Sequence, residues 1–158
     1  SSTHYFDFRK APKYNSWSFS IHPLLADNAG FFKELPISDV SVSPFFFWKF
    51  VYYKKMGGDN HRAIGDGTAL SISKKAMLRL LLLPSKSVAS IDGYKSSLLQ
   101  TAFNQRKNRY GDDADLVLIG HPKAFTQFSL QHLDVFIENN RKESFLTISE
   151  WGSNELQN

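Results

Sequence analysis

Three side chains that can carry acid–base chemistry each follow a predicted strand. They are Arg9, Asp92 and His121, which follow the predicted strands 5–8, 88–91 and 115–120. In parallel α/β proteins the reactive side chains stand at the carboxyl ends of strands, because those ends open into loops. A carboxylate can orient an imidazole that exchanges a proton, and a guanidinium can fix another carboxylate. The pattern therefore predicts an acid–base site in which Asp92 pairs with His121 near Arg9.

Each of these residues also has an ordinary structural interpretation. A histidine at a strand end can simply bond to its own loop, and Asp92-Gly93 is a common turn pair. An arginine at a sheet edge, such as Arg9, is typically a solvated charge. The functional interpretation rests on the joint placement of the three residues at strand ends.

The elements that must position this site alternate along the second half of the chain. We expect helices at 44–56, from Ser71 or Ser73 to Leu83, from Ser96 or Ser97 to Tyr110, and from Thr126 or Ser129 through Ile137. Strands are expected at 5–8, 37–42, 88–91, 115–120 and 145–149. The alternation of strand and helix favours right-handed crossovers, which predict an α/β fold with a parallel sheet.

Composition limits the classes of protein that fit. The chain has 158 residues, 42% hydrophobic and 22% charged, which predicts one globular domain, 1–158. It has no cysteine, so disulfides, thiolate zinc sites and cysteine nucleophiles are excluded. A net charge of +4 is too small to favour nucleic acid as a partner. The aromatic content of 15% predicts either a thick core or a groove lined by rings.

Two segments of the C-terminal part resemble a known family. The sequence Leu-Val-Leu-Ile-Gly-His-Pro-Lys at 116–123 and Phe-Leu-Thr-Ile-Ser-Glu at 145–150 resemble the C-terminal end of the NodB-type polysaccharide deacetylases, carbohydrate esterase family 4. Residues 8–12 resemble its Arg-x-Pro segment, and Asp92 lies where the family has an aspartate that pairs with its catalytic histidine. The resemblance implies part of a (β/α) barrel with parallel strands and crossover helices.

The family's chemistry is hydrolytic N-deacetylation of an acetylated amino sugar in a polysaccharide by a metal-activated water. By resemblance, His121 would protonate the leaving amine, Asp92 would hold its tautomer, and Arg9 would brace the base. Ile119 would line the pocket for the acetyl methyl group. The aromatic residues expected to line the saccharide groove are Trp17, residues 45–48 and Tyr52-Tyr53, with Trp17 and Trp48 as the assigned substrate contacts.

The chain departs from the family pattern in the segments that hold the metal. Thr-Phe-Asp-Asp and His-x-x-x-His are absent, no Trp follows Asp92, and two residues instead of one separate Arg9 from Pro12. The family implies Zn²⁺ or another divalent metal, but its usual ligands are not in this chain, so no metal ligand is assigned. The nearest substitute is the loop with Asp59, His61 and Asp66. We therefore expect the C-terminal portion of a barrel, completed by an N-terminal half.

Other classes stay open. One is a non-catalytic carbohydrate-binding or membrane-surface module, in which 44–55 is an aromatic and basic interfacial segment. Another is a catalytically dead barrel remnant. As a partner, an acetylated polysaccharide or glycan is favoured over a membrane surface. The chain begins without Met and without a signal-peptide pattern, so we expect that an upstream segment was removed, and the compartment stays open between bacterial cytoplasm and cell envelope.

Overall fold

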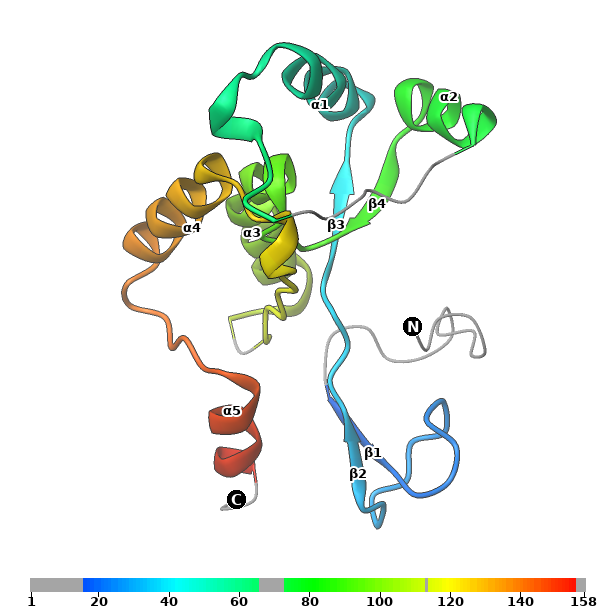
Figure 1. The fold of residues 1–158 in the computed structure, drawn as a ribbon. Coiled ribbons are helices and arrows are strands. Elements are labelled where there is room, and N and C mark those ends of the chain that lie inside the picture. Colours follow the sequence, from blue (N-terminus) through cyan, green and yellow to red (C-terminus); the bar gives the residue numbers. More distant parts are fainter. Residues whose placement is uncertain (1–15, 66–72, 113, 156–158) are drawn as a thin grey trace.

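The computed structural model describes residues 16–65, 73–112 and 114–155 (Figure 1). The strands are β1 (Trp17–Phe19), β2 (Phe32–Glu34), β3 (Asp39–Val42) and β4 (Ser85–Val88). The helices are α1 (Pro44–Met56), α2 (Lys74–Leu82), α3 (Leu99–Tyr110), α4 (Gln127–Asn139) and α5 (Ile148–Glu155). Short 3₁₀ helices are η3 (Asp59–His61), η4 (Gly93–Leu98) and η5 (Pro122–Ala124).

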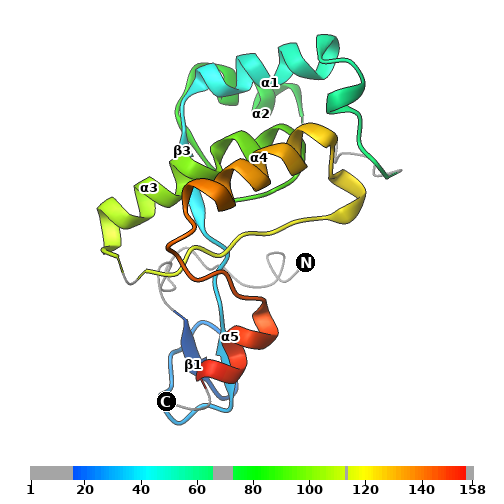
Figure 2. The same cartoon turned by 90° about the vertical axis from the view of Figure 1, so that its left-hand side faces the viewer.

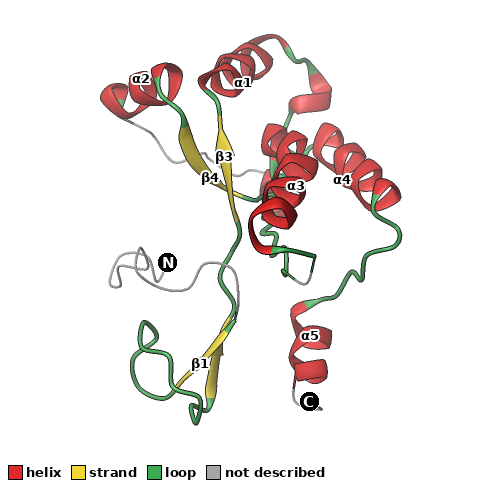
Figure 3. Ribbon diagram, turned by 180° about the vertical axis from the view of Figure 1, so that it is seen from behind, coloured by secondary structure: helices red, strands yellow, loops and turns green. Residues whose placement is uncertain are grey.

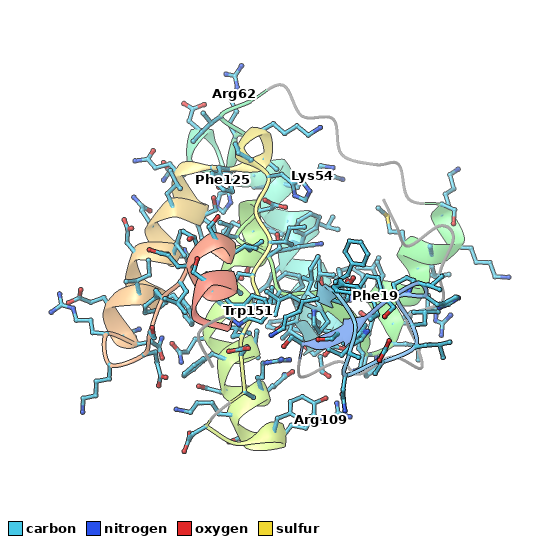
Figure 4. The ribbon with its side chains drawn as sticks, turned by 90° about the horizontal axis from the view of Figure 1, so that it is seen from below. Phe19, Lys54, Arg62, Arg109, Phe125 and Trp151 are labelled. Carbon is cyan, nitrogen blue, oxygen red and sulfur yellow. The ribbon has the colours of Figure 1, made fainter. Side chains whose placement is uncertain are left out.

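The hairpin β1–β2 and helix α5 form one end of the molecule (Figures 1 and 2). Phe19 stacks on Phe32 across the hairpin, with 5.5 Å between ring centroids. The ammonium group of Lys33 lies 5.9 Å from the ring centroid of Trp151, so the hairpin contacts α5. Figure 4 shows Phe19 and Trp151 on these two neighbouring elements, seen from below.

The main core lies between the antiparallel pair β3–β4 and the helices beside it (Figure 3). Its buried side chains are Val40, Val42, Phe46, Ala89 and Ala102, contributed by β3, α1, the segment after β4, and α3. The side chains of β3 alternate in burial, because successive residues of a strand point to opposite faces. Ala89 directly follows β4 and is buried in this core, so the core fixes the start of the segment 89–92.

Local signals in the sequence place the helices correctly. Helix α1 has Pro44 at its first position, and Ser73 caps α2 by accepting a hydrogen bond from the Ala76 N–H. Thr126 and Ser129 form a reciprocal capping box at the start of α4. The predicted helices at 44–56, 73–83 and from Thr126 are confirmed, as is the strand within 37–42.

The prediction of an α/β fold that is part of a (β/α) barrel with parallel strands is wrong. The described residues form two separate two-stranded antiparallel sheets, β1–β2 and β3–β4. Two helices, α1 and α2, connect β3 to β4. The chain enters β4 at the same end of the sheet at which it leaves β3, so the two strands run antiparallel. A single crossover helix would have made them parallel. The strand–helix periodicity does not distinguish these two connections.

Two of the predicted strands also take a different form. Residues 115–120 are extended, but they contribute only one isolated bridge, from Ile119 to Ser90. Residues 145–149 lead into α5, where Thr147 accepts a hydrogen bond from the Glu150 N–H and the Glu150 carboxylate accepts from the Thr147 N–H. This Thr-x-x-Glu capping box overrides the β-branched pattern of the segment.

None of the helices in the described ranges is both long enough and apolar enough to cross a membrane. The predicted strand 5–8 lies outside the described residues.

Candidate acid–base site

A single parallel bridge brings Asp92 and His121 together. Ser90 pairs with Ile119 in parallel orientation, with Ile91 N–H donating to the Ile119 carbonyl at 3.0 Å. Asp92 and His121 each lie two residues beyond the bridged positions. Because paired parallel segments run in the same direction, both side chains emerge at the same end. The rule about strand ends therefore holds locally, although no parallel sheet is present in the described part of the chain.

The Asp92 carboxylate holds His121 by two hydrogen bonds. One oxygen accepts from the His121 backbone N–H, and the other lies 2.7 Å from the ring Nδ1. This contact confirms the predicted pairing of the two residues. With the Nδ1 proton directed at the carboxylate, the second ring nitrogen, Nε2, is the position left to exchange a proton. The His121 side chain is 54% exposed and that of Asp92 is 21% exposed, so the imidazole is open to a ligand.

The local electrostatics keep Asp92 ionised. Partial burial by itself raises the pKa of the Asp92 carboxyl, but hydrogen bonds from the His121 backbone, the His121 ring and Ser90 lower it more. The net effect is an Asp92 pKa below its ordinary value of 3.8. At neutral pH the pair therefore contains a carboxylate that acts purely as an acceptor toward the imidazole.

The backbone around the pair is fixed by short turns. Asp92 precedes η4 and accepts the Lys95 N–H on its carbonyl, which leaves its side chain for His121. A Cβ atom on Gly120 would lie 2.5 Å from the side chain of Ile91. Glycine at 120 therefore permits the close approach of the two segments just before His121.

Tyr94, a ring that the sequence did not lead us to expect at the site, lies two residues after Asp92. Tyr94 stacks on Tyr53, Phe46 and Phe128, with centroid separations of 5.0, 5.3 and 5.4 Å. Partial burial raises the pKa of the Tyr94 hydroxyl, and Tyr53 adds to the shift, so this ring stays neutral at physiological pH. The position of Tyr94, two residues after the aspartate at the predicted strand end, is the sequence signal that could have identified it as a residue near the site.

The other predicted site residues are placed differently. Arg9 lies outside the described residues. Ile119 is half-buried and its backbone forms the bridge that positions the pair. Trp17 is buried in the β1 hairpin and donates to the Pro23 carbonyl, so its ring is a core side chain. Trp48 lies on α1, is exposed, and donates to the Leu81 carbonyl.

The described residues do not fit the metal that the family resemblance implies. Across 16–65, 73–112 and 114–155, no group of three His, Asp or Glu side chains could hold an ion. In the loop with Asp59, His61 and Asp66, the His61 ring packs against Phe128 and Tyr53, and Asp66 lies outside the described residues. We derive no chemical step through a metal.

Comparison of the chain with protein-family models, curated proteins and solved structures finds no match. The function of the chain is therefore inferred from the geometry of the Asp92–His121 pair and from the local resemblance of the segments around it.

Proposed function

We propose that this chain acts in the hydrolytic N-deacetylation of an acetylated amino sugar in a polysaccharide, with His121 as the proton donor to the leaving amine. The observation that carries the proposal is the pair of 2.7 Å hydrogen bonds from His121 to Asp92. They hold one ring nitrogen on a carboxylate while the imidazole stays exposed. Such a pair is the arrangement that general acid catalysis uses.

The proton step needs only this pair. In this hydrolysis a water oxygen bonds to the acetyl carbon and releases its proton to solvent, the bond between the acetyl carbon and the sugar nitrogen breaks to give acetate, and the departing amine gains a proton. Protonated His121 donates it from Nε2, while Asp92 keeps the proton on Nδ1 and stabilises the imidazolium by its negative charge.

The test uses the histidine ring signals of the complete chain in NMR spectra. Chitin oligomers, which carry N-acetyl groups, are titrated into the protein at millimolar concentration. We expect the ring signals of His121 to shift, because the proton donor must lie against the acetamido group. The ring signals of His22, which lies in the connection between β1 and β2, serve as the internal reference.

A second measurement follows acetate release from the same oligomers. Any activity must fall by about 10²-fold or more in His121→Gln, the range for loss of a general acid. A matched control is His22→Gln, which changes an exposed histidine in the connection between β1 and β2. Acetate release that survives unchanged in His121→Gln, or unmoved His121 signals during the titration, would overturn the proposal.

A further inference from the structure

Helix α1 is apolar on two faces, and only one of them is covered. Phe46 is 9% exposed and packs in the core, whereas Phe45, Trp48, Tyr52 and Met56 are 65, 56, 60 and 70% exposed. The spacing of these four residues places them along one side of the helix. A helix that is hydrophobic all round is normally buried. The exposed side of α1 is therefore expected to have a ligand or partner surface.

Helix α2 extends this uncovered surface. It has nine residues and none of them is buried, and its apolar side chains Met77, Leu78 and Leu82 are 47, 57 and 62% exposed. A helix this short is marginal in water without packing. The indole N–H of Trp48 donates to the Leu81 carbonyl at 3.0 Å, which joins α1 to α2. Both helices lie at the end of the molecule opposite the β1–β2 hairpin (Figures 1 and 2).

The charges on these two helices are all positive. Six cations lie on them, Lys49, Lys54, Lys55, Lys74, Lys75 and Arg79, and neither helix contains Asp or Glu. None of the six forms a salt bridge with another described residue. We call the exposed side chains and cations of α1 and α2 the α1–α2 face. Its occupant must be both apolar and anionic.

We propose that the α1–α2 face docks on an anionic membrane surface. Trp and Tyr rings suit the headgroup level of a bilayer, Phe, Met and Leu side chains suit the acyl boundary, and lysines pair with lipid phosphates. A second copy of the chain does not fit, because its own face would set cations against cations. This peripheral docking requires no membrane-spanning helix, and it is independent of the Asp92–His121 pair.

Co-sedimentation of the complete chain with lipid vesicles tests the proposal. We expect binding to vesicles that contain phosphatidylglycerol in phosphatidylcholine, and weak binding to phosphatidylcholine alone. The double variant Lys49→Gln, Lys55→Gln removes the two lysines that flank the exposed stripe of α1 and should bind about 25-fold less tightly, about fivefold for each lysine lost near the surface. Tyr52→Ser, which removes an exposed ring from the face, should also weaken binding.

Matched variants separate the face from net charge. Arg109→Gln, Lys142→Gln removes two exposed cations elsewhere, one of them in the last turn of α3. Figure 4 shows Lys54 and Arg109 on different parts of the molecule. Phe31→Ser removes a ring that is 94% exposed beside the β1–β2 hairpin. We expect both controls to bind like the wild type.

Two results would overturn the proposal. One is no binding to the anionic vesicles by a wild-type chain shown to be folded by circular dichroism, which would leave an acidic polypeptide surface as the occupant. The other is an equal loss of binding in the Arg109, Lys142 control, which would mean that net charge and not this face controls association.

Discussion

Replacing Asp92 by Asn tests the central pair most directly. The substitution keeps the size of the side chain and removes its charge. In the wild type both carboxylate oxygens accept hydrogen bonds from His121, each at 2.7 Å. Asparagine has a single acceptor oxygen, so it can keep only one of these bonds, and that bond becomes neutral. The Nδ1 proton of His121 is then no longer fixed by a carboxylate.

The expected magnitude follows from the number and type of these bonds. Hydrogen bonds to a charged group stabilise by roughly 1.5–3 kcal/mol each, against roughly 0.5–1.5 kcal/mol for neutral ones. Because the His121 side chain is 54% exposed, water replaces part of the lost interaction. We expect Asp92→Asn to lower the free energy of unfolding by about 1–2 kcal/mol, which at this chain length lowers Tm by about 2–8 °C.

The direction of the Asp92 pKa shift determines how the stability difference between wild type and Asp92→Asn changes with pH. The pKa of Asp92 is lower in the folded protein than its ordinary value of 3.8, so ionisation of this carboxyl stabilises the fold. That stabilisation is complete above the pKa of the unfolded chain and is lost as pH falls through the folded-state pKa. The difference in stability between wild type and Asp92→Asn should therefore be steady at pH 5–6 and shrink below about pH 4.

Urea unfolding followed by circular dichroism at several pH values between 6 and 3 measures this difference. Asp134→Asn is the matched control, since it removes an exposed carboxylate on α4. We expect the control to change stability by less than about 0.5 kcal/mol. If Asp92→Asn unfolds at the same urea concentration as the wild type at pH 6, or if their difference grows toward pH 3, the electrostatic reasoning is refuted.

Three further variants test the packing around the site by thermal unfolding. Phe136→Ala should destabilise the chain by about 3–5 kcal/mol, because Phe136 is 4% exposed in the core and its loss leaves a cavity; a cost below about 1 kcal/mol would contradict this packing. Thr126→Ala should cost about 1–2 kcal/mol by removing the α4 cap to the Ser129 N–H, and an unchanged Tm would be inconsistent with the capping box. Gly30→Ala should also destabilise, since its Cβ would meet the backbone of Phe19 at 2.3 Å, and the β1–β2 amides should lose hydrogen-exchange protection first.

The helix starts were accessible from the sequence because their signals act within a few residues. The first turn of a helix has N–H groups without a partner in the helix. Pro44 has no N–H at the start of α1, and the side chains of Ser73 and Thr126 accept a hydrogen bond from such a group in α2 and α4. The Thr147–Glu150 capping box is a signal of the same kind: it begins α5 at Ile148 within the segment that we predict as a strand, 145–149. This cap is also a local signal, but the β-branched residues and the family resemblance favoured a strand in the prediction.

The contact between Asp92 and His121 was predictable from less than the complete fold. It needs only that two short extended segments run in the same direction, and the Ser90–Ile119 bridge supplies that direction. The predicted roles of Trp17 and Trp48 needed more, because an indole that is buried in a hairpin and one that is exposed on a helix look alike in sequence. Burial depends on which elements pack together, and that is a non-local property.

The sequence alone is enough to predict helices α1 to α4, the caps of α2 and α4, and the residue types able to exchange a proton, because propensities and caps act between neighbours in the chain. The pairing of the strands depends on the tertiary structure. Strand pairing joins residues far apart in sequence, such as Val42 with Ser85, and its direction depends on whether the helices between them cross over or return. The tertiary structure also left α1 and α2 uncovered on one side, since a residue pattern shows that a face is apolar but not what lies against it.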